Sequence, residues 1–224
     1  MERLRMTRRM SCSSSSSSSF ISRRNVIAAG AGGAALLGGG PLALAQSRVP
    51  LSGKFASPLY MQFPPGEAVP TAIEAQGYRF PVEWYDTAGQ SYTADDLKGR
   101  LTLIQFWRTR CGACQHEVPA LDAVAAQLED SRLRIIAIAL MEDSLADIQR
   151  FYDRYRIRNL RIYQDRDHLA FSQIAPAHPS HGVRATPTTV LVSPTGHYVS
   201  AYSGAPGWER PEGIKLLRWY RDNA

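Results

Sequence analysis

Two cysteines three positions apart are the residues of this sequence best suited to chemistry. Cys111 and Cys114 follow an apolar, β-favouring run at 101–107 and precede a helical pattern at 117–128. We therefore expect the pair where a buried strand ends and a helix begins. The unpaired N–H groups and the positive dipole end of a helix start stabilise a thiolate, which is the reactive form of cysteine. The spacing indicates thiol–disulfide exchange, in which Cys111 attacks and Cys114 resolves the mixed disulfide.

Other uses of a Cys-x-x-Cys pair leave one alternative of a different class. A c-type haem site requires histidine directly after the second cysteine, where this chain has Gln115. An inert disulfide across one helical turn would stabilise the fold little. A peroxidase is disfavoured because no Pro-x-x-x-Thr-x-x-Cys pattern precedes Cys111. A zinc or copper site needs further ligands, which His178 and His181 could supply, so a metal-handling binding module is the alternative.

The positive charge of the chain is concentrated at its N-terminus. The 224 residues carry 26 Lys and Arg against 20 Asp and Glu, a formal net charge of +6. Six of these arginines and one glutamate lie within residues 1–45, which leaves 20 basic and 19 acidic residues, or +1, for the remainder. A nearly neutral body gives no reason to expect nucleic-acid binding. The length and the apolar fraction of 44% fit one globular domain with an appendage.

Residues 1–45 have the parts of an export signal. The segment 22–27 resembles the twin-arginine motif, a weakly apolar Gly/Ala-rich stretch follows it, and 43–45 offers an Ala-x-Ala cleavage site. We therefore expect the protein to be exported in folded form to the periplasm. An uncleaved membrane anchor is the alternative, although the stretch is only marginally apolar for a span.

The rest of the chain alternates strand and helix patterns. Residues 46–74 are rich in proline and small residues and are predicted to be a linker or an arm, and residues 75–224 the domain. Strands are expected at 80–85, 101–107, 133–140, 160–163, 188–192 and 197–203, and helices at 117–128, from Asp143 or Ser144 to Tyr155, at 167–174 and from Pro211 onward. This order predicts an α/β fold with a central mixed sheet flanked by helices.

The motifs around the cysteines resemble those of the thioredoxin superfamily. Phe106-Trp107 is followed by three residues and then Cys-Gly-Ala-Cys. Pro187, directly before a predicted strand, fits the place of the superfamily's cis-proline. Within this superfamily the chain most resembles the exported TlpA/ResA-like branch. The shared residues lie before, within and after the cysteine site: Asp96-Leu97-Lys98-Gly99, Glu117, Pro119, Gly204 and Trp208.

This resemblance covers residues 75–222 and implies a fold and an activity. It implies a thioredoxin fold and a thiol–disulfide oxidoreductase that reduces protein disulfides. A membrane thiol transporter would supply the electrons. No cofactor is expected besides the redox-active disulfide between Cys111 and Cys114, and we expect a monomer.

The resemblance also assigns roles to single residues. Glu117, one turn below the cysteines, would take the proton of the resolving thiol if burial raises its pKa. Pro187 would shape the substrate groove and leave the backbone of Thr186 free to pair with an extended peptide.

Four further residues are expected to line or support the substrate groove. Trp107 is expected to pack under the site, and Arg110, Gly112 and Ala113 adjoin the sulfurs. Arg110 and the Gly112-Ala113 dipeptide depart from the usual family pattern and should change thiolate stability. Gln105 stands where thioredoxin has a buried aspartate, so any buried proton carrier would be Glu117.

Overall fold

A computed structural model of the chain describes residues 49–57, 61–62, 68–175 and 185–223. The predicted export signal and both His178 and His181 lie outside the described residues. In the part of the chain that is described, the helices are too short or too polar to cross a bilayer.

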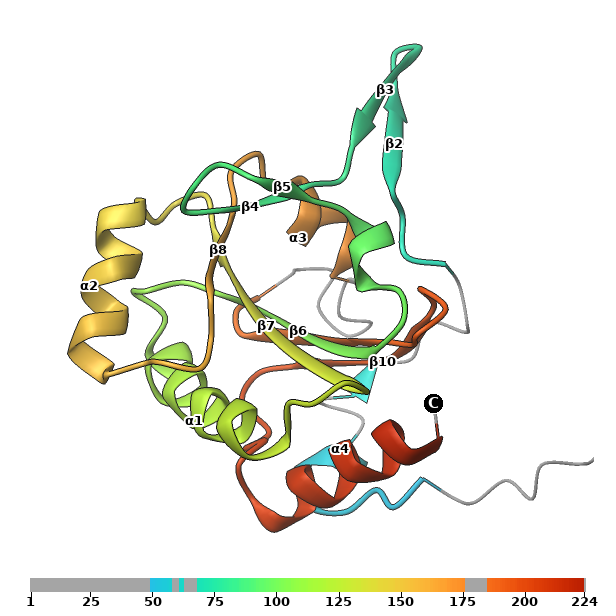
Figure 1. Ribbon diagram of the computed structural model, residues 1–224, viewed down its shortest axis with the longest axis vertical. Helices are drawn as coiled ribbons and strands as arrows, with labels where there is room; N and C mark the ends of the chain where they lie inside the picture. Colours follow the sequence, from blue (N-terminus) through green and yellow to red (C-terminus); the bar gives the residue numbers. More distant parts are fainter. Residues whose placement is uncertain (1–48, 58–60, 63–67, 176–184, 224) are drawn as a thin grey trace, which may run out of the picture. The chain divides into compact units, whose positions relative to one another are not determined.

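Eight strands form one mixed sheet. They are β1 (Met61–Gln62), β4 (Trp84–Asp86), β5 (Ser91–Tyr92), β6 (Leu101–Trp107), β7 (Leu133–Leu140), β8 (Ile162–Asp165), β9 (Thr188–Val192) and β10 (Tyr198–Ser203). Their order across the sheet is β1-β10-β9-β6-β7-β8-β4-β5 (Figure 1). The β6–β7 and β7–β8 pairs are parallel and the others antiparallel. The expected α/β fold with a central mixed sheet is confirmed.

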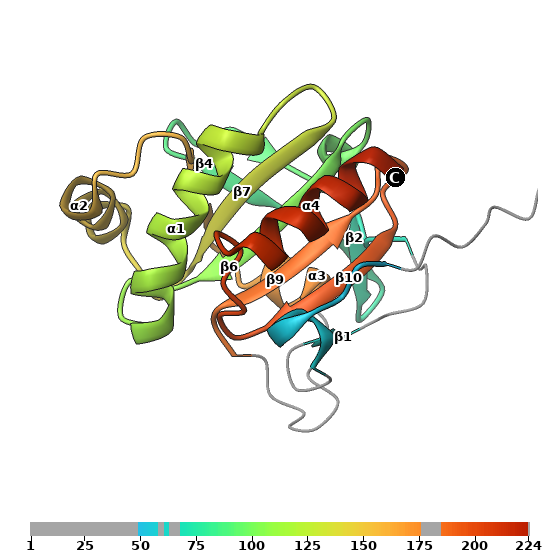
Figure 2. The ribbon, with the colours of Figure 1, turned by 90° about the horizontal axis from the view of Figure 1, so that it is seen from below.

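Helices cover both faces of this sheet. They are α1 (Gly112–Leu128), α2 (Leu145–Tyr155), α3 (Leu169–Ile174) and α4 (Pro211–Asn223), with 3-10 turns η1 (Gly53–Ala56) and η2 (Ala94–Leu97). Successive side chains of a strand point to opposite faces. The odd-numbered core residues of β6 and β7 accordingly pack with α1, α2 and α4, and the even-numbered ones with α3. Figure 2 shows α1 and α4 side by side on one face.

Most predicted elements are confirmed, some with shifted bounds, and the strand predicted at 80–85 is wrong. The bounds of β6, β7 and β9 are as expected, whereas α1 reaches back to Gly112. The single strand predicted at 80–85 is two strands in different sheets: the N–H of Val82 still donates to the carbonyl of Thr71 at 2.9 Å, in register with a separate hairpin, whereas Trp84–Asp86 pairs in the main sheet. The strand predicted at 160–163 begins two residues later, because the N–H of Leu160 donates to the Asp122 carboxylate at 3.0 Å.

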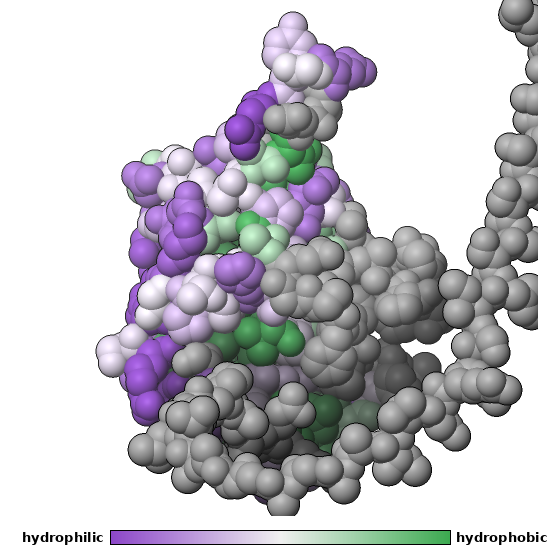
Figure 3. Space-filling model, turned by 90° about the vertical axis from the view of Figure 1, so that its right-hand side faces the viewer, coloured by the Kyte–Doolittle hydropathy of each residue, from purple (hydrophilic) through white to green (hydrophobic). Residues whose placement is uncertain are grey.

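The predicted N-terminal arm packs on the domain. Phe55 is 1% exposed, and its ring centroid lies 5.5 Å from that of Tyr202 and 4.7 Å from that of Trp208. Strand β1 adds to the sheet edge at β10. Strands β2 (Ala72–Ala75) and β3 (Tyr78–Pro81) form a separate hairpin. The predicted boundary between arm and domain, at residues 74 and 75, falls inside this hairpin. This hairpin projects from the sheet, and the coloured part of it in Figure 3 is mainly hydrophilic.

Candidate active site

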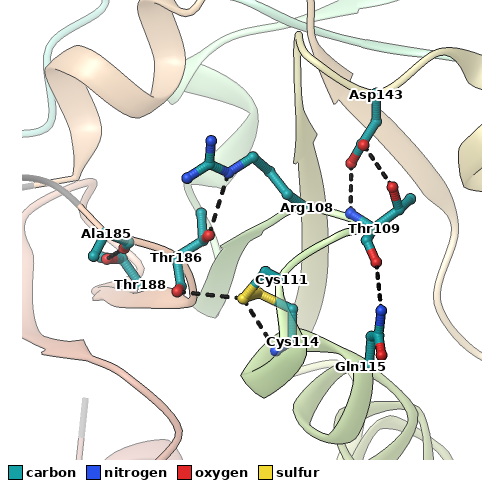
Figure 4. The surroundings of a disulfide bond; sticks show 9 residues. All are labelled: Arg108, Thr109, Cys111, Cys114, Gln115, Asp143, Ala185, Thr186 and Thr188. Carbon is teal, nitrogen blue, oxygen red and sulfur yellow. Dashed lines mark hydrogen bonds between the residues drawn. A yellow bond between two sulfur atoms is a disulfide. The ribbon is translucent and has the colours of Figure 1, made fainter.

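The two cysteines lie at the junction of β6 and α1, as expected, and are joined by a disulfide. Cys111 is the N-cap of α1, and the N–H of Cys114 donates to its sulfur at 3.2 Å (Figure 4). Cys114 is fully buried, whereas Cys111 is partly exposed. A helix start that donates to Cys111 favours negative charge on that sulfur.

The segment before β9 faces Cys111. The Sγ of Cys111 lies 3.3 Å from the carbonyl oxygen of Thr186. The Thr186–Pro187 peptide bond is cis, which is the form that the family resemblance implies. A disulfide sulfur carries no proton, so this contact becomes a hydrogen bond only when Cys111 is a thiol. The Oγ1 of Thr188 donates to the carbonyl of Ala185 at 2.5 Å, which ties the segment together next to the sulfur.

A buried carboxylate fixes the loop between β6 and α1. Asp143 is 4% exposed and accepts two hydrogen bonds of 2.6 Å, from the N–H and from the hydroxyl of Thr109. The Nε2 of Gln115 donates to the carbonyl of Thr109 at 3.0 Å. The backbone just before Cys111 is therefore held from two sides (Figure 4).

Sequence reasoning missed this role of Asp143. The pattern predicts only that a helix begins at Asp143 or Ser144, and Ser144 is the N-cap of α2. A usable signal was its position just after β7. The carboxyl ends of parallel neighbours lie at the same sheet edge, which brings Asp143 beside the end of β6.

Two arginines lie near the reactive sulfur, and among the described residues only Arg108 has partners. Arg108 donates from Nε to the hydroxyl of Thr186 at 3.4 Å and forms an ion pair with Glu142 at 3.3 Å. Arg110 is exposed and has neither a hydrogen bond nor an ion pair among the described residues. The two arginines, Cys111, Glu142 and Asp143 line a cavity of about 290 Å³.

Glu117 is buried one helical turn below Cys114. It is 4% exposed, and its Oε1 has no hydrogen-bond partner within the described residues. Burial and the nearby charge of Glu209 raise the pKa of Glu117 to about 7, although the backbone of Gly207 and Trp208 and the ammonium group of Lys54 oppose this rise. A carboxyl group that titrates near neutral pH can accept and return a proton under working conditions.

Polar groups on β6 are also buried under the site. Gln105 and Trp107 are both 0% exposed, and neither the Gln105 amide nor the Trp107 Nε1 has a partner in the described part of the chain. The ring of Trp107 packs against Phe151, with centroids 4.6 Å apart. Trp107 and Cys114 belong to the same buried cluster. Gly112 and Ala113 form the first turn of α1, and both are exposed beside the sulfurs.

The described residues offer no group of three metal-binding side chains. A cluster of at least three His, Cys, Asp or Glu is not found within them. His178 and His181 lie in the gap at 176–184, so the metal-handling alternative stays a prediction.

Comparison with known proteins places this geometry in a family. The AhpC/TSA family profile matches residues 66–199. The thiol-disulfide oxidoreductase ResA of Halalkalibacterium halodurans is 29% identical over 129 residues, which cover 58% of this chain and 67% of that protein. ResA of Bacillus subtilis is 29% identical over 119 residues, covering 53% and 62%. The matches thus span about two thirds of these relatives.

Two solved structures show the same fold. The thioredoxin domain of a thiol-disulfide oxidoreductase from Bacteroides vulgatus has a TM-score of 0.51 and 18% identity, over 71% of this chain and 99% of that one. A thiol:disulfide interchange protein DsbE from Chlorobium tepidum has a TM-score of 0.51 and 18% identity, over 71% and 96%. The expected thioredoxin fold is confirmed. With a profile match over more than half of its residues, this chain belongs to the AhpC/TSA family, within the thioredoxin superfamily.

Proposed function

We propose that this protein is a periplasmic thiol–disulfide oxidoreductase that reduces disulfide bonds of other proteins. The observation that carries the proposal is the asymmetry of the cysteine pair. Cys111 is partly exposed at the helix start, and Cys114 is fully buried behind it. The attacking sulfur must reach a substrate, whereas the resolving sulfur needs to reach only Cys111. The difference in exposure therefore supports the order of attack inferred from the sequence.

In the reducing direction the cycle starts from two thiols. The Cys111 thiolate attacks one sulfur of the substrate disulfide, the substrate S–S bond breaks, and the released thiolate takes up a proton. Cys114 then gives up its proton and attacks the Cys111 sulfur of the mixed disulfide, which releases the second substrate thiolate. The substrate gains two electrons, and the two cysteines lose two electrons as they form the Cys111–Cys114 disulfide.

Three features of the site support these steps. The N–H of Cys114 stabilises negative charge on Cys111. Glu117, with its pKa raised to about 7, is the proposed acceptor of the Cys114 proton. The Thr186 backbone, which faces Cys111, would pair with an extended substrate segment in the groove that Pro187 shapes.

Export and resupply of electrons complete the proposal. The twin-arginine-type signal within residues 1–45 would deliver the folded protein to the periplasm, where a membrane thiol transporter would reduce the Cys111–Cys114 disulfide again. The protein would act as a monomer without another cofactor. Replacing both Arg23 and Arg24 by lysine should leave the full chain in the cytoplasm, and unchanged export of that variant would contradict this route.

Reduction of insulin tests the activity. The full chain, supplied with a dithiol, should reduce the insulin disulfides, and the Cys111→Ser variant should lose this activity. If the metal-free Cys111→Ser variant reduces insulin as fast as the wild type, the proposed oxidoreductase activity of the cysteine pair is refuted. Stoichiometric zinc or copper in the purified protein would instead favour the metal-handling alternative.

Trapping identifies the substrate. The Cys114→Ser variant should accumulate as a mixed disulfide between Cys111 and its partner protein, because the second step is blocked. The trapped partner can then be identified by mass spectrometry after release with a reductant.

A further inference from the structure

The cavity beside Cys111 contains one charged group that has no partner among the described residues. Its lining includes two arginines and two carboxylates, and Cys111 itself borders it. The volume of about 290 Å³ is enough for one substrate side chain to enter. The contacts of each charged group show which of them is free to bind such a side chain.

Three of the four charged groups already have partners in the protein. Asp143 accepts both of its hydrogen bonds from Thr109. Arg108 is shared between the Thr186 hydroxyl and Glu142, and Glu142 is held in turn by this ion pair. Arg108 and Glu142 thus pair with each other, and both oxygens of Asp143, which is 4% exposed, are occupied by donors of Thr109.

Arg110 is the exception. It is exposed, it lies directly before Cys111, and it makes no ion pair or hydrogen bond with the rest of the described chain. A guanidinium group presents two parallel N–H donors that match the two oxygens of a carboxylate. Arg110 is therefore the charged group of the cavity that is left to bind a ligand, and its geometry favours a carboxylate.

We infer that this cavity is a subsite for an acidic side chain of the substrate protein, an aspartate or glutamate close to the cysteine that Cys111 attacks, with Arg110 as its main ligand. The inference rests on the proposed function, because only a substrate in exchange with Cys111 would place a side chain there. An extended chain advances about 3.3 Å per residue, so a side chain one or two positions from the target cysteine reaches the cavity.

Three peptides with a single disulfide test the subsite. They differ only in the residues that flank one cysteine, which are aspartates, serines or lysines. The full chain in its reduced form is mixed with each peptide at low ionic strength, and the second-order rate constants are measured. The variants are Arg110→Gln and Arg110→Glu. The control is Arg218→Gln, since Arg218 is an exposed arginine of α4 that lines none of the cavities described.

The ratio of the acidic to the lysine peptide rate is the measured quantity. Loss of Arg110 also changes the stability of the Cys111 thiolate, but that effect is common to all peptides and cancels in the ratio. The wild type and Arg218→Gln should favour the acidic peptide about fivefold, a ratio that falls as salt is added. The ratio should fall to about one in Arg110→Gln and invert in Arg110→Glu.

Different failures point to different parts of the account. Equal wild-type rates with all three peptides, or an unchanged preference in Arg110→Gln, would overturn the subsite while leaving the exchange activity in place. Failure of the reduced protein to react with the serine peptide would contradict the proposed function itself.

Discussion

Two buried carboxyl groups lie near the cysteine pair, and they differ in how many of their oxygens accept hydrogen bonds. Asp143 and Glu117 are each 4% exposed. Asp143 accepts two short hydrogen bonds from Thr109, whereas one oxygen of Glu117 has no partner among the residues described. The two sides of the site thus differ in how completely their polar groups are satisfied.

This difference separates a fixed side from a reactive side. The two short hydrogen bonds to Asp143 hold Thr109 in place, so the Asp143 side sets the position of the loop that leads to Cys111. A carboxyl group that is buried without enough donors gains or loses a proton easily near neutral pH. The protein therefore keeps its loop rigid on one side and keeps a proton exchangeable on the other.

The largest predicted effect is on the fixed side. Asp143→Ala leaves the N–H and hydroxyl of Thr109 without their acceptor and should lower the free energy of unfolding by about 4 kcal/mol, since hydrogen bonds to a charged group contribute about 1.5–3 kcal/mol each. Chemical denaturation of the full chain measures this. Asp153→Ala, at an exposed position of α2, is the control and should cost less than about 1 kcal/mol. Equal losses of unfolding free energy in both variants would contradict a special role of Asp143 in holding the loop.

The next effect is a pH dependence on the reactive side. The pKa of Glu117 is raised from 4.5 to about 7, so the folded state favours the protonated form. The stabilisation linked to that proton is complete below about pH 4.5 and is lost as the pH rises through about 7. It amounts to at most about 3 kcal/mol.

Glu117→Gln should remove this pH dependence. The difference in unfolding free energy between the variant and the wild type should shift in favour of the variant as the pH rises from 5 to 8. Denaturation curves at several pH values measure the shift. A constant difference across that range would mean that Glu117 titrates no differently in the folded and unfolded protein.

A smaller effect is expected at the segment that covers Glu117. A Cβ on Gly213 would lie 2.5 Å from the carbonyl oxygen of Trp208, so Gly213→Ala must displace the backbone there. Such overpacking should cost about 2 kcal/mol. Gly112→Ala is the matched control, because nothing lies within 4 Å of a Cβ at that position. Equal stability of the two variants would show that the Gly213 contact relaxes freely.

The smallest effect is expected at Gln105. Its buried amide has no hydrogen-bond partner in the described part of the chain, so Gln105→Leu, which keeps a similar volume, should raise the free energy of unfolding by about 1 kcal/mol. A loss of stability in thermal or chemical unfolding would show that the amide contributes to the polar side of the site.

The sequence predicted those parts of the fold that depend on local patterns. Strands β6 and β7 are unbroken apolar runs, and their bounds were read correctly because each run ends in polar or turn residues. The early start of α1 was missed because the first turn around the cysteines has no apolar stripe. It is stabilised instead by the donation of the Cys114 N–H to Cys111.

Long-range contacts set the limit of sequence reasoning at the site. The Cys pair and the cis bond before Pro187 follow from motifs, but the bonds of Asp143 to Thr109 join residues 34 positions apart. The burial of Glu117 depends on Gly207 and Trp208, which are distant in sequence. The insertion of Phe55 against Tyr202 and Trp208 depends likewise on contacts that only the fold creates.

The central claim is that Glu117 takes the proton of Cys114, and an aromatic disulfide isolates that step. Reduced protein mixed with Ellman's reagent releases one thionitrobenzoate when Cys111 attacks and a second when Cys114 resolves the mixed disulfide. The second release is followed from pH 5 to 9 in the wild type, in Glu117→Gln and in Glu129→Gln. Glu129 is the control, since it follows the opposite end of α1 and burial raises its pKa as well.

We predict that the wild type and Glu129→Gln show an inflection of the second rate near pH 7, and that Glu117→Gln loses it and is about tenfold slower at pH 7. An identical second rate and pH profile in all three proteins would contradict proton transfer through Glu117.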